Sequence, residues 1–343
     1  MEISSLVPIV LAAGKGTRMR SDRPKVLHDV FFEPMLHHVL KALQGAFSAS
    51  PLVVIGHKAE EVSENLSGFD LVTVRQTEQL GTGHAVLSCR EELAHHSGPV
   101  LILCGDSPLI TSGTLRGFVE SHLQSGAPLT LMTTRLNDPS GYGRIVCDPQ
   151  GRILRIVEEK DADPDQKAIA EINAGIYCVD CCLLINALER IGYNNRQGEM
   201  YLTDIVGIAT ADHLVVNRYF CTDSEEVLGV NTRRELAHAH GILQKRHLHA
   251  LMDSGVSIIQ PELVTVAGSV VIGNETVISP HTWITGSTTI GCGVTIEPFV
   301  KIVDCSIGDR ASIGAFCHLQ GRVVPTGVTL APHTSDCSAM MPL

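Results

Sequence analysis

A short segment near the N-terminus concentrates residues that bind anions. Residues 14–25, GKGTRMRSDRPK, hold two glycines, a threonine and five cationic side chains against one aspartate. Where such a turn follows a strand and opens a helix, as we expect here, backbone N–H groups point at an anion. Two familiar phosphate loops are excluded, because Met19 stands where a Walker A motif and a dinucleotide fingerprint need glycine. A cationic loop at a strand end favours a polyphosphate ligand; a solvated basic loop is the alternative.

The chain as a whole is acidic, so this loop is not part of a general basic surface. Its 343 residues carry 26 Lys and Arg against 37 Asp and Glu, a formal net charge of −11. That balance, with only 4% aromatic residues, argues against nucleic acid and against an anionic membrane as partners. Eleven cysteines without a framework spacing, and no secretory signal, predict reduced thiols and a cytoplasmic location. No apolar run approaches the roughly 18 residues that a membrane helix needs.

Up to about residue 250, short apolar runs alternate with longer mixed segments. Strands buried on both faces are predicted at residues 7–13, 51–56, 70–76 and 99–106, and helices at 32–43, 57–66 and 83–96. Later pieces of the same half are 129–136, 152–159, 171–180 and a helix at 182–192, before a long helix over 231–255. This alternation is typical of βαβ units. The fold class is therefore predicted as α/β, with a mainly parallel sheet and helices on both faces.

From about residue 256 the period changes to six. Isoleucines occupy positions 272, 278, 284, 290, 296 and 302, and after a reset Ile307, Ile313 and Leu319 resume the step. Small or β-branched residues follow each of them by four, namely Thr276, Thr282, Thr288, Val294, Val300, Ser306, Ala311, Cys317 and Val323. A six-residue step is the signature of hexapeptide repeats. It predicts a short left-handed parallel β-helix of about three coils with the isoleucines on its axis.

Further motifs follow one another along the first 250 residues. They are LAAGKGTRM (11–19), PK (24–25), QTEQLGTGHA (76–85), CGD (104–106), DPSGYGRI (138–145), VEEKD (157–161), EINAG (171–175), QGEMYLTD (197–204) and GVN (229–231). Together they resemble the bacterial N-acetylglucosamine-1-phosphate uridyltransferases, which form the first half of a bifunctional enzyme. The resemblance covers about residues 6–255 and, more loosely, the hexapeptide region. Residues 76–85 and 138–145 carry its most specific motifs.

This resemblance implies an architecture and an activity. It implies a Rossmann-like nucleotidyltransferase domain over residues 1–230, a linker helix over 231–255, a β-helix over 256–337 and a tail over 338–343. The implied reaction makes a UDP-sugar, UDP-N-acetylglucosamine first of all, from UTP and a sugar 1-phosphate. The sugar phosphate attacks the α-phosphorus in line and pyrophosphate leaves, so no protein nucleophile is needed.

The resemblance also implies roles for individual residues. The nucleotide-binding residues would be Leu11, Ala12, Ala13, Gly14, Gly16, Thr17, Gln76, Gly81 and Thr82. The catalytic residues would be Arg18, Lys25 and Asp106, and Asp106 with Asn231 would hold Mg²⁺ through oxygen atoms. The sugar-phosphate pocket would comprise Gly143, Glu158, Asn173, Tyr201 and Thr203. Taken singly, Gln76 could be an ordinary surface residue and Asp106 an ordinary turn residue.

Three departures from the family pattern leave alternatives open. Glu33, Cys104 and Ala174 stand where the family commonly has other residues, close to the sugar and metal sites. Another hexose 1-phosphate, such as glucose 1-phosphate or glucosamine 1-phosphate, is therefore the alternative acceptor. A non-catalytic sugar-nucleotide-binding regulatory protein is the alternative from another class, although Lys25, Asp106 and Asn231 are all present, which favours the enzyme.

The hexapeptide region carries two further expectations. In the resembled family the acetyltransferase residues lie in further β-helix turns, which have no counterpart in this sequence, so no acetyltransferase activity is expected. The repeats imply a homotrimer assembled through residues 256–337, with a monomer as the alternative. The outward residues that would supply apolar contact are Val271, Val277, Trp283, Phe299 and Phe316.

Overall fold

The structure is a computed structural model and describes residues 5–336. It divides into two compact units, the first ending at Leu236 and the second beginning at Ala237. The tail expected over 338–343 lies outside the described residues. Within residues 5–336, the helices are too short or too polar to cross a membrane.

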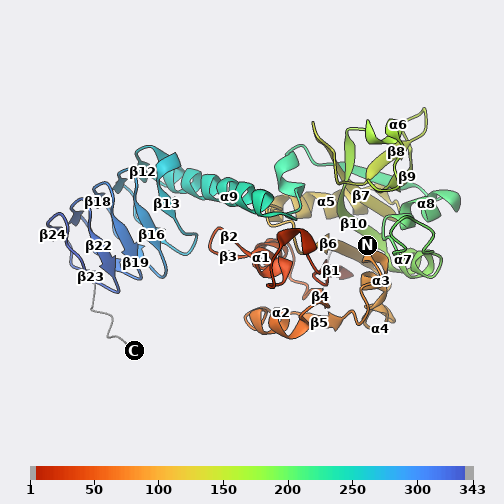
Figure 1. The fold of residues 1–343 in the computed structure, drawn as a ribbon, viewed down its shortest axis with the longest axis horizontal. Coiled ribbons are helices and arrows are strands. Elements are labelled where there is room, and N and C mark those ends of the chain that lie inside the picture. The colour runs from red at the N-terminus through yellow and green to blue at the C-terminus, as the bar shows by residue number, and fades with distance from the viewer. Residues whose placement is uncertain (1–4, 337–343) are drawn as a thin grey trace. The chain divides into compact units, whose positions relative to one another are not determined.

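A nine-stranded sheet forms the centre of the first unit (Figure 1). Its main path runs β11-β7-β10-β6-β1-β4-β5, and β8 and β9 extend it from β10. The strands are β1 (Val7–Leu11), β4 (Leu52–Ile55), β5 (Val72–Arg75), β6 (Pro99–Cys104), β7 (Leu129–Arg135), β8 (Arg144–Cys147), β9 (Ile153–Val157), β10 (Glu171–Asp180) and β11 (Val216–Phe220). The pairs β6-β1, β1-β4, β4-β5 and β7-β11 are parallel, while β10 runs antiparallel to both of its neighbours on the main path. The α/β class with a mainly parallel sheet is confirmed.

Burial along the strands follows their place in the sheet. The side chains of β4 are buried along its whole length, because β4 has a strand on each side and helices over both faces. Strand β5 was expected to be buried in the same way, and this was wrong: only Val74 of its four residues is buried. The physical reason is that β5 is the edge strand, where one face and one side remain open to solvent.

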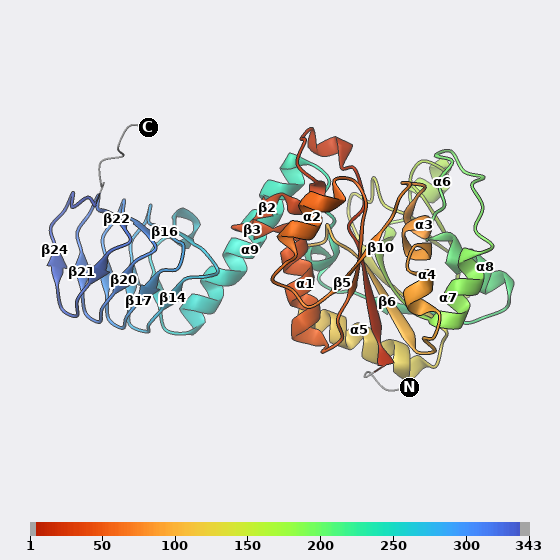
Figure 2. The same cartoon turned by 90° about the horizontal axis from the view of Figure 1, so that it is seen from below.

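Helices cover both faces of this sheet, as predicted (Figure 2). One face carries α1 (Met35–Ala46) and α5 (Ser112–Ser125), which share an apolar core that includes Leu40 and Phe118. The other face carries α3 (Thr82–Leu87), α4 (Arg90–Leu93), α7 (Cys181–Leu188) and α8 (Asp204–Ala211) over a second core. The single helix predicted across residues 83–96 is therefore two short ones. Smaller elements are α2 (Ala59–Asn65), α6 (Pro164–Lys167), η2 (Thr17–Met19), η3 (Lys25–Leu27), η4 (Ser224–Val227), β2 (Asp29–Val30) and β3 (Glu33–Pro34).

The long helix α9 (Arg233–Asp253) starts in the first unit and ends in the second. Its last turns contribute Leu248 and Leu251 to the apolar core of the second unit. Its first turn lies two residues beyond Asn231, so it helps to define the backbone of a candidate site residue.

The second unit is a parallel β-helix built from three sheets. The first sheet holds β12 (Ser257–Ile258), β15 (Val277–Ile278), β18 (Thr295–Ile296), β21 (Ser312–Ile313) and β24 (Thr329–Leu330). The second holds β13 (Thr265–Val266), β16 (Trp283–Thr285), β19 (Lys301–Val303) and β22 (His318–Gln320), after the short turn η5 (Pro261–Leu263). The third holds β14 (Val271–Ile272), β17 (Thr289–Ile290), β20 (Ser306–Ile307) and β23 (Val323–Val324). Each pair is parallel, and the isoleucine series is buried, as expected for a left-handed β-helix of hexapeptide repeats.

One detail of the repeat prediction was wrong, and the repeat changes length at one place. The sheets hold four or five strands, so there are four coils rather than three; the step of six begins at Ile272 in β14, the last strand of the first coil. The residue three after Ile302, Cys305, is buried, whereas Ser306 and Val323, four after Ile302 and Leu319, are exposed, Val323 to 72%. The coil that pairs Thr289 with Ser306 is one residue shorter than the coil that pairs Val271 with Thr289, which moves the inward place back by one.

Candidate functional site

A cavity of about 470 Å³ opens at the carboxyl ends of β1 and β6 in the first unit. Ligands in open α/β sheets bind at this edge. Nine of the residues singled out from the sequence line it: Leu11, Ala12, Ala13, Gly14, Lys25, Gln76, Gly81, Thr82 and Asp106. Lys15, Val26, Gln79, Ala85, Cys104 and Glu199 line it too and were not singled out as binding residues. All but Val26 lie inside quoted motifs, so motif membership was the signal available for them.

Two glycines, Gly16 of the cationic loop and Gly81 of the segment 76–85, permit close backbone approach. Gly16 has φ +61°, and a Cβ there would lie 2.5 Å from the Cβ of Lys25. Gly81 has φ +117°, and a Cβ there would meet the carbonyl oxygen of Met200 at 2.6 Å. Both positions therefore require glycine. The helix expected to open in this loop is instead the single 3₁₀ turn η2, because Gly16 and Arg20 on either side of it adopt left-handed backbone.

The side chains of Lys25, Asp106 and Asn231 meet at one end of the cavity. The Lys25 ammonium donates to Asp106 Oδ2 and, at 2.8 Å, to Asn231 Oδ1. Arg18 Nη2 also donates to Asn231 Oδ1 at 2.8 Å. Gly16, Thr17, Arg18 and Asn231 do not line the cavity; Arg18 and Asn231 join the group through these hydrogen bonds.

The same oxygen atoms suit a hard divalent cation. Asp106 Oδ2 and Asn231 Oδ1 already converge on one cationic group, the Lys25 ammonium, which shows that a positive charge fits between them. Within residues 5–336, three or more His, Cys, Asp or Glu side chains do not gather anywhere as metal ligands. A metal here would thus have one carboxylate and one amide oxygen from the protein. This is a usual set for Mg²⁺, which keeps several waters and phosphate oxygens.

Gln76 is a buried residue in the wall of the cavity, with 4% of its surface exposed. Its Nε2 donates to the carbonyl oxygen of Gly81 and to Nδ1 of His84, both at 3.1 Å. A carbonyl oxygen can only accept a hydrogen bond, so the Nε2 side of the Gln76 carboxamide must face the carbonyl of Gly81. Among the described residues no donor contacts Oε1, so the carboxamide offers an acceptor to a ligand. The partner residue His84 was not singled out from the sequence.

The five sugar-site residues lie outside the lining of this cavity. Thr203 Oγ1 donates to Glu158 Oε1 at 3.0 Å, and the backbone N–H of Asn173 donates to the carbonyl oxygen of Gly143 at 2.9 Å. A Cβ on Gly143 would lie 3.5 Å from Glu158 Oε1 and 3.7 Å from the Cβ of Asn173. These four residues therefore form one group. Tyr201 lies two residues before Thr203 in the sequence and is buried. Its hydroxyl oxygen accepts a hydrogen bond from Gln197 Nε2 at 2.7 Å.

Charged side chains of both groups, around Asp106 and around Glu158, act on the thiol of Cys104. Burial, followed by the carboxylates of Asp106 and Glu158, raises the pKa of the Cys104 thiol to about 12, against a lowering effect of Lys25. Burial is also the main cause that raises the pKa of Glu158, with Asp204 adding to it. The thiol is thus neutral at physiological pH and acts as a small side chain at the end of β6 rather than as a nucleophile.

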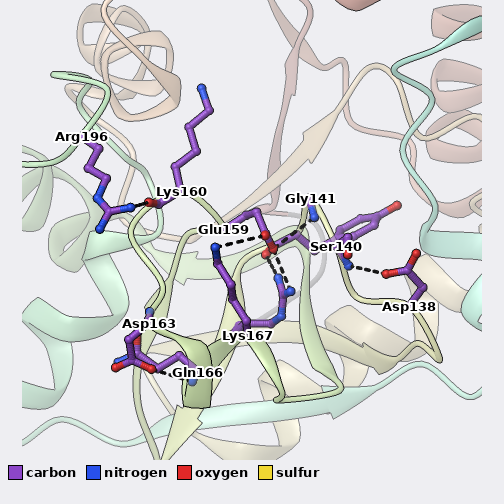
Figure 3. Close-up of polar contacts among 11 residues, drawn as sticks. Asp138, Ser140, Gly141, Glu159, Lys160, Asp163, Gln166, Lys167 and Arg196 are labelled. Atoms are coloured by element: carbon purple, nitrogen blue, oxygen red, sulfur yellow. Dashed lines mark hydrogen bonds and ion pairs between the residues drawn. The ribbon is translucent and has the colours of Figure 1, made fainter.

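An ion pair between a buried arginine and a half-buried glutamate supports the loop that carries Gly143. Arg144 is 1% exposed, and its Nη2 lies 2.7 Å from Glu159 Oε2. Figure 3 shows the Glu159 carboxylate between the backbone N–H of Gly141 and the ammonium of Lys167, at 3.3 and 3.8 Å. The pair links the start of β8 to the end of β9, where Gly143 and Glu158 stand. Sequence reasoning missed Arg144, because its burial depends on tertiary packing.

Comparison with known proteins identifies a domain family and relatives of the chain. The family described as MobA-like NTP transferase domain matches residues 8–178. The bifunctional protein GlmU of Pelobacter propionicus is 44% identical over 331 residues, covering 96% of this chain and 72% of that relative. GlmU of Heliobacterium modesticaldum is 47% identical, and the match covers 92% of this chain and 69% of that relative. GlmU of Desulfotalea psychrophila is 43% identical, and the match covers 93% of this chain and 94% of that relative.

The fold, the cavity at the carboxyl edge and the domain match define a nucleotidyltransferase. More particularly, the chain belongs to the family of the bifunctional GlmU proteins.

Proposed function

We propose that this protein makes UDP-N-acetylglucosamine from UTP and N-acetylglucosamine 1-phosphate and releases pyrophosphate. One observation carries the proposal most directly: Lys25, Asp106 and Asn231 meet at the end of a cavity of nucleotide size beside the group formed by Glu158, Asn173 and Thr203. The names of the relatives point to the same activity.

The two groups of residues divide the substrates between them. The uracil would stack over the small residues Ala12 and Ala13 and donate its N3–H to Gln76 Oε1. The triphosphate would lie along the cationic loop, near Lys15 and Lys25. The sugar 1-phosphate would occupy the group around Glu158, from which its phosphate can reach the α-phosphorus.

The chemistry then needs positioning and charge neutralisation. An oxygen of the sugar phosphate, which is mostly dianionic near neutral pH, forms a bond to the α-phosphorus while the bond to pyrophosphate breaks. Lys25 and Arg18 oppose the negative charge that develops, and the loop holds the phosphates in line. Asp106 and Asn231 would hold Mg²⁺, which supplies Lewis-acid charge neutralisation when bound.

A screen of substrates tests this proposal. Pyrophosphate release would be measured for UTP and the other nucleoside triphosphates against N-acetylglucosamine, glucosamine and glucose 1-phosphates. We expect UTP with N-acetylglucosamine 1-phosphate to be the best pair. A better rate with another hexose 1-phosphate would establish the alternative acceptor. Saturable binding of the sugar nucleotide without any turnover would establish the non-catalytic regulatory protein.

Substitution of the metal-holding carboxylate is the first specific prediction. Asp106→Asn keeps the shape but removes the charge, so we expect kcat to fall by about 100-fold or more and the wild-type enzyme to stop in EDTA. Asp70→Asn, at an exposed aspartate bonded to Ser50, is the matched control and should keep full activity. Full activity of Asp106→Asn, or of the wild type in EDTA, would contradict the proposed role.

The assembly and location of the protein are also proposals. Val271, Trp283, Phe299 and Phe316 are 43–65% exposed on the β-helix, which supports a homotrimer formed through residues 256–337. Light scattering of the full chain at micromolar concentration decides between trimer and monomer. The cysteines of the described residues are all free thiols, which supports a reducing, cytoplasmic location. We also retain residues 1–230, 231–255 and 256–337 as the functional division of the chain.

A further inference from the structure

Strand β10 is irregular where it passes the sugar site. Asn173 pairs with Thr133 of β7 and Tyr177 pairs with Leu131, so β10 advances four residues while β7 advances two. The two extra residues form a bulge that includes Gly175, whose φ is +73°. Because the excess is an even number, Asn173 and Tyr177 stay on the same face of the strand.

The side chains of these two residues meet on that face. Asn173 Nδ2 donates to the hydroxyl oxygen of Tyr177 at 2.6 Å, and the backbone N–H of Gly175 donates to Asn173 Oδ1 at 3.1 Å. Asn173 is 8% exposed and Tyr177 is 2% exposed. A backbone N–H can donate only to the oxygen of a carboxamide, so the bulge and the hydroxyl together define which way the Asn173 amide points.

Counting donors and acceptors shows what remains for a ligand. One of the two Nδ2 protons is used by Tyr177, and one lone pair of Oδ1 is used by Gly175, which leaves one donor and one acceptor. Burial, followed by the Glu158 carboxylate, raises the pKa of Tyr177 well above its usual value, so the hydroxyl stays protonated and neutral. Without this hydroxyl the amide would lose a buried acceptor, and its broad terminal torsion would be held from one side only.

We propose that Tyr177 is a positioning residue for sugar selectivity, whose hydroxyl orients the Asn173 carboxamide toward the N-acetyl group of the sugar 1-phosphate. This inference rests on the proposed function. The remaining donor and acceptor of the carboxamide are separate atoms, and they complement the carbonyl and the N–H of an N-acetyl group. A hydroxyl at the same ring carbon carries its donor and acceptor on one atom and cannot meet both.

The test replaces only the hydroxyl, in the full-length protein. In Tyr177→Phe we expect the KM for N-acetylglucosamine 1-phosphate to rise about tenfold, with kcat and the KM for UTP little changed. The ratio of kcat/KM for N-acetylglucosamine 1-phosphate to kcat/KM for glucose 1-phosphate should fall by a similar factor. Tyr219→Phe is the matched control, because Tyr219 packs on Phe118 away from the cavity and should lose nothing. Equal losses with both sugar phosphates, or no loss relative to Tyr219→Phe, would overturn the proposal.

A double-mutant cycle separates positioning from general support. If Tyr177 acts through Asn173, then Asn173→Ala/Tyr177→Phe should bind the sugar no worse than Asn173→Ala alone. Additive losses would overturn the proposal. The cycle can be run by calorimetric titration of sugar 1-phosphate, which needs no turnover. A wild type that prefers another hexose 1-phosphate would refute the proposed acceptor and the N-acetyl selectivity. The cycle with that sugar would still decide whether Tyr177 positions Asn173.

Discussion

At the scale of single residues, Lys25 places its positive charge between two oxygen-bearing side chains. Its ammonium bonds Asp106 and Asn231 in the structure, where it stands between the oxygen atoms that would hold a metal. A bound triphosphate offers the ammonium a more negative partner. Lys25 therefore matters most where charge builds up during transfer, rather than in the binding of UTP.

The second prediction follows from that position. Lys25→Ala should lower kcat by about 100-fold and change the UTP affinity by much less. Steady-state kinetics with a calorimetric Kd for UTP would separate the two effects. Lys41→Ala, which removes an exposed lysine paired with Glu33 on the surface, should leave both unchanged. A loss of UTP affinity as large as the loss of kcat/KM, with kcat intact, would refute the transition-state role.

The third prediction concerns Glu158, whose pKa is raised by burial and then by Asp204, Asp161 and Glu199. A carboxyl with a raised folded-state pKa contributes stability below its unfolded pKa, and that contribution is lost as pH rises through the folded pKa. The ionised Glu158 therefore costs stability at neutral pH. Glu158→Gln should melt at a higher temperature near pH 8, with the advantage vanishing near pH 4. Its kcat/KM for the sugar phosphate should fall about 10- to 100-fold.

Calorimetry at the two pH values, with Glu64→Gln as a control at an exposed glutamate of α2, measures the effect. A lower melting temperature for Glu158→Gln near pH 8 would show that the carboxylate is stabilised by groups other than those named.

At the scale of secondary structure, the first turn of α9 determines the backbone position of Asn231. Glu235 Oε2 accepts from the backbone N–H of Asn231 at 2.6 Å and of Thr232 at 3.0 Å. Thr232 Oγ1 accepts from the backbone N–H of Glu235 at 3.2 Å. This reciprocal cap satisfies backbone donors that a helix start leaves open. It also fixes Asn231 where Lys25 and Arg18 meet it.

The fourth prediction is that Glu235→Ala weakens both the helix and the site. The loss of the cap should cost about 1 kcal/mol in the free energy of unfolding, and activity at limiting Mg²⁺ should fall several-fold. Urea unfolding and a Mg²⁺ titration of the rate measure the two effects. Glu120→Ala, at an exposed glutamate of α5, should change neither. If stability falls while the Mg²⁺ dependence stays the same, the cap does not position Asn231.

At the scale of the whole molecule, two compact units are joined by one helix, and each has its own apolar core. The candidate site draws its described residues from the first unit alone. Destabilising the core of the second unit should therefore leave nucleotidyl transfer intact, so long as the first unit stays folded.

The fifth prediction uses an axial isoleucine. Ile296→Ala, at a fully buried position of β18, should lower the free energy of unfolding of the β-helix by about 3 kcal/mol. In calorimetry, the melting temperature of the β-helix transition should fall while that of the first unit stays the same. At a temperature below both transitions, kcat/KM should match the wild type. Thr295→Ala changes the exposed neighbour and is the control. A loss of activity in Ile296→Ala alone would show that the two units are energetically coupled.

The sequence by itself determined the classes of local structure, and its motifs proposed the candidate site residues. Short apolar runs alternating with longer mixed segments predicted the α/β unit, and the six-residue isoleucine step predicted the β-helix, because each pattern belongs to one kind of backbone geometry. The motifs alone pointed to Lys25, Asp106 and Asn231. They did so through residue type and resemblance, and not through contact.

Only the tertiary structure decided which of these side chains meet. Lys25 lies 81 residues from Asp106 and 206 from Asn231, and only the packing of the sheet and the start of α9 bring them within hydrogen-bonding distance. The same holds for the open edge at β5, for the ion pair of the buried Arg144 and for the hydroxyl of Tyr177 against Asn173. Each depends on which segments become neighbours in space. Local periodicity does not encode that, because burial and hydrogen bonding are set by the whole fold.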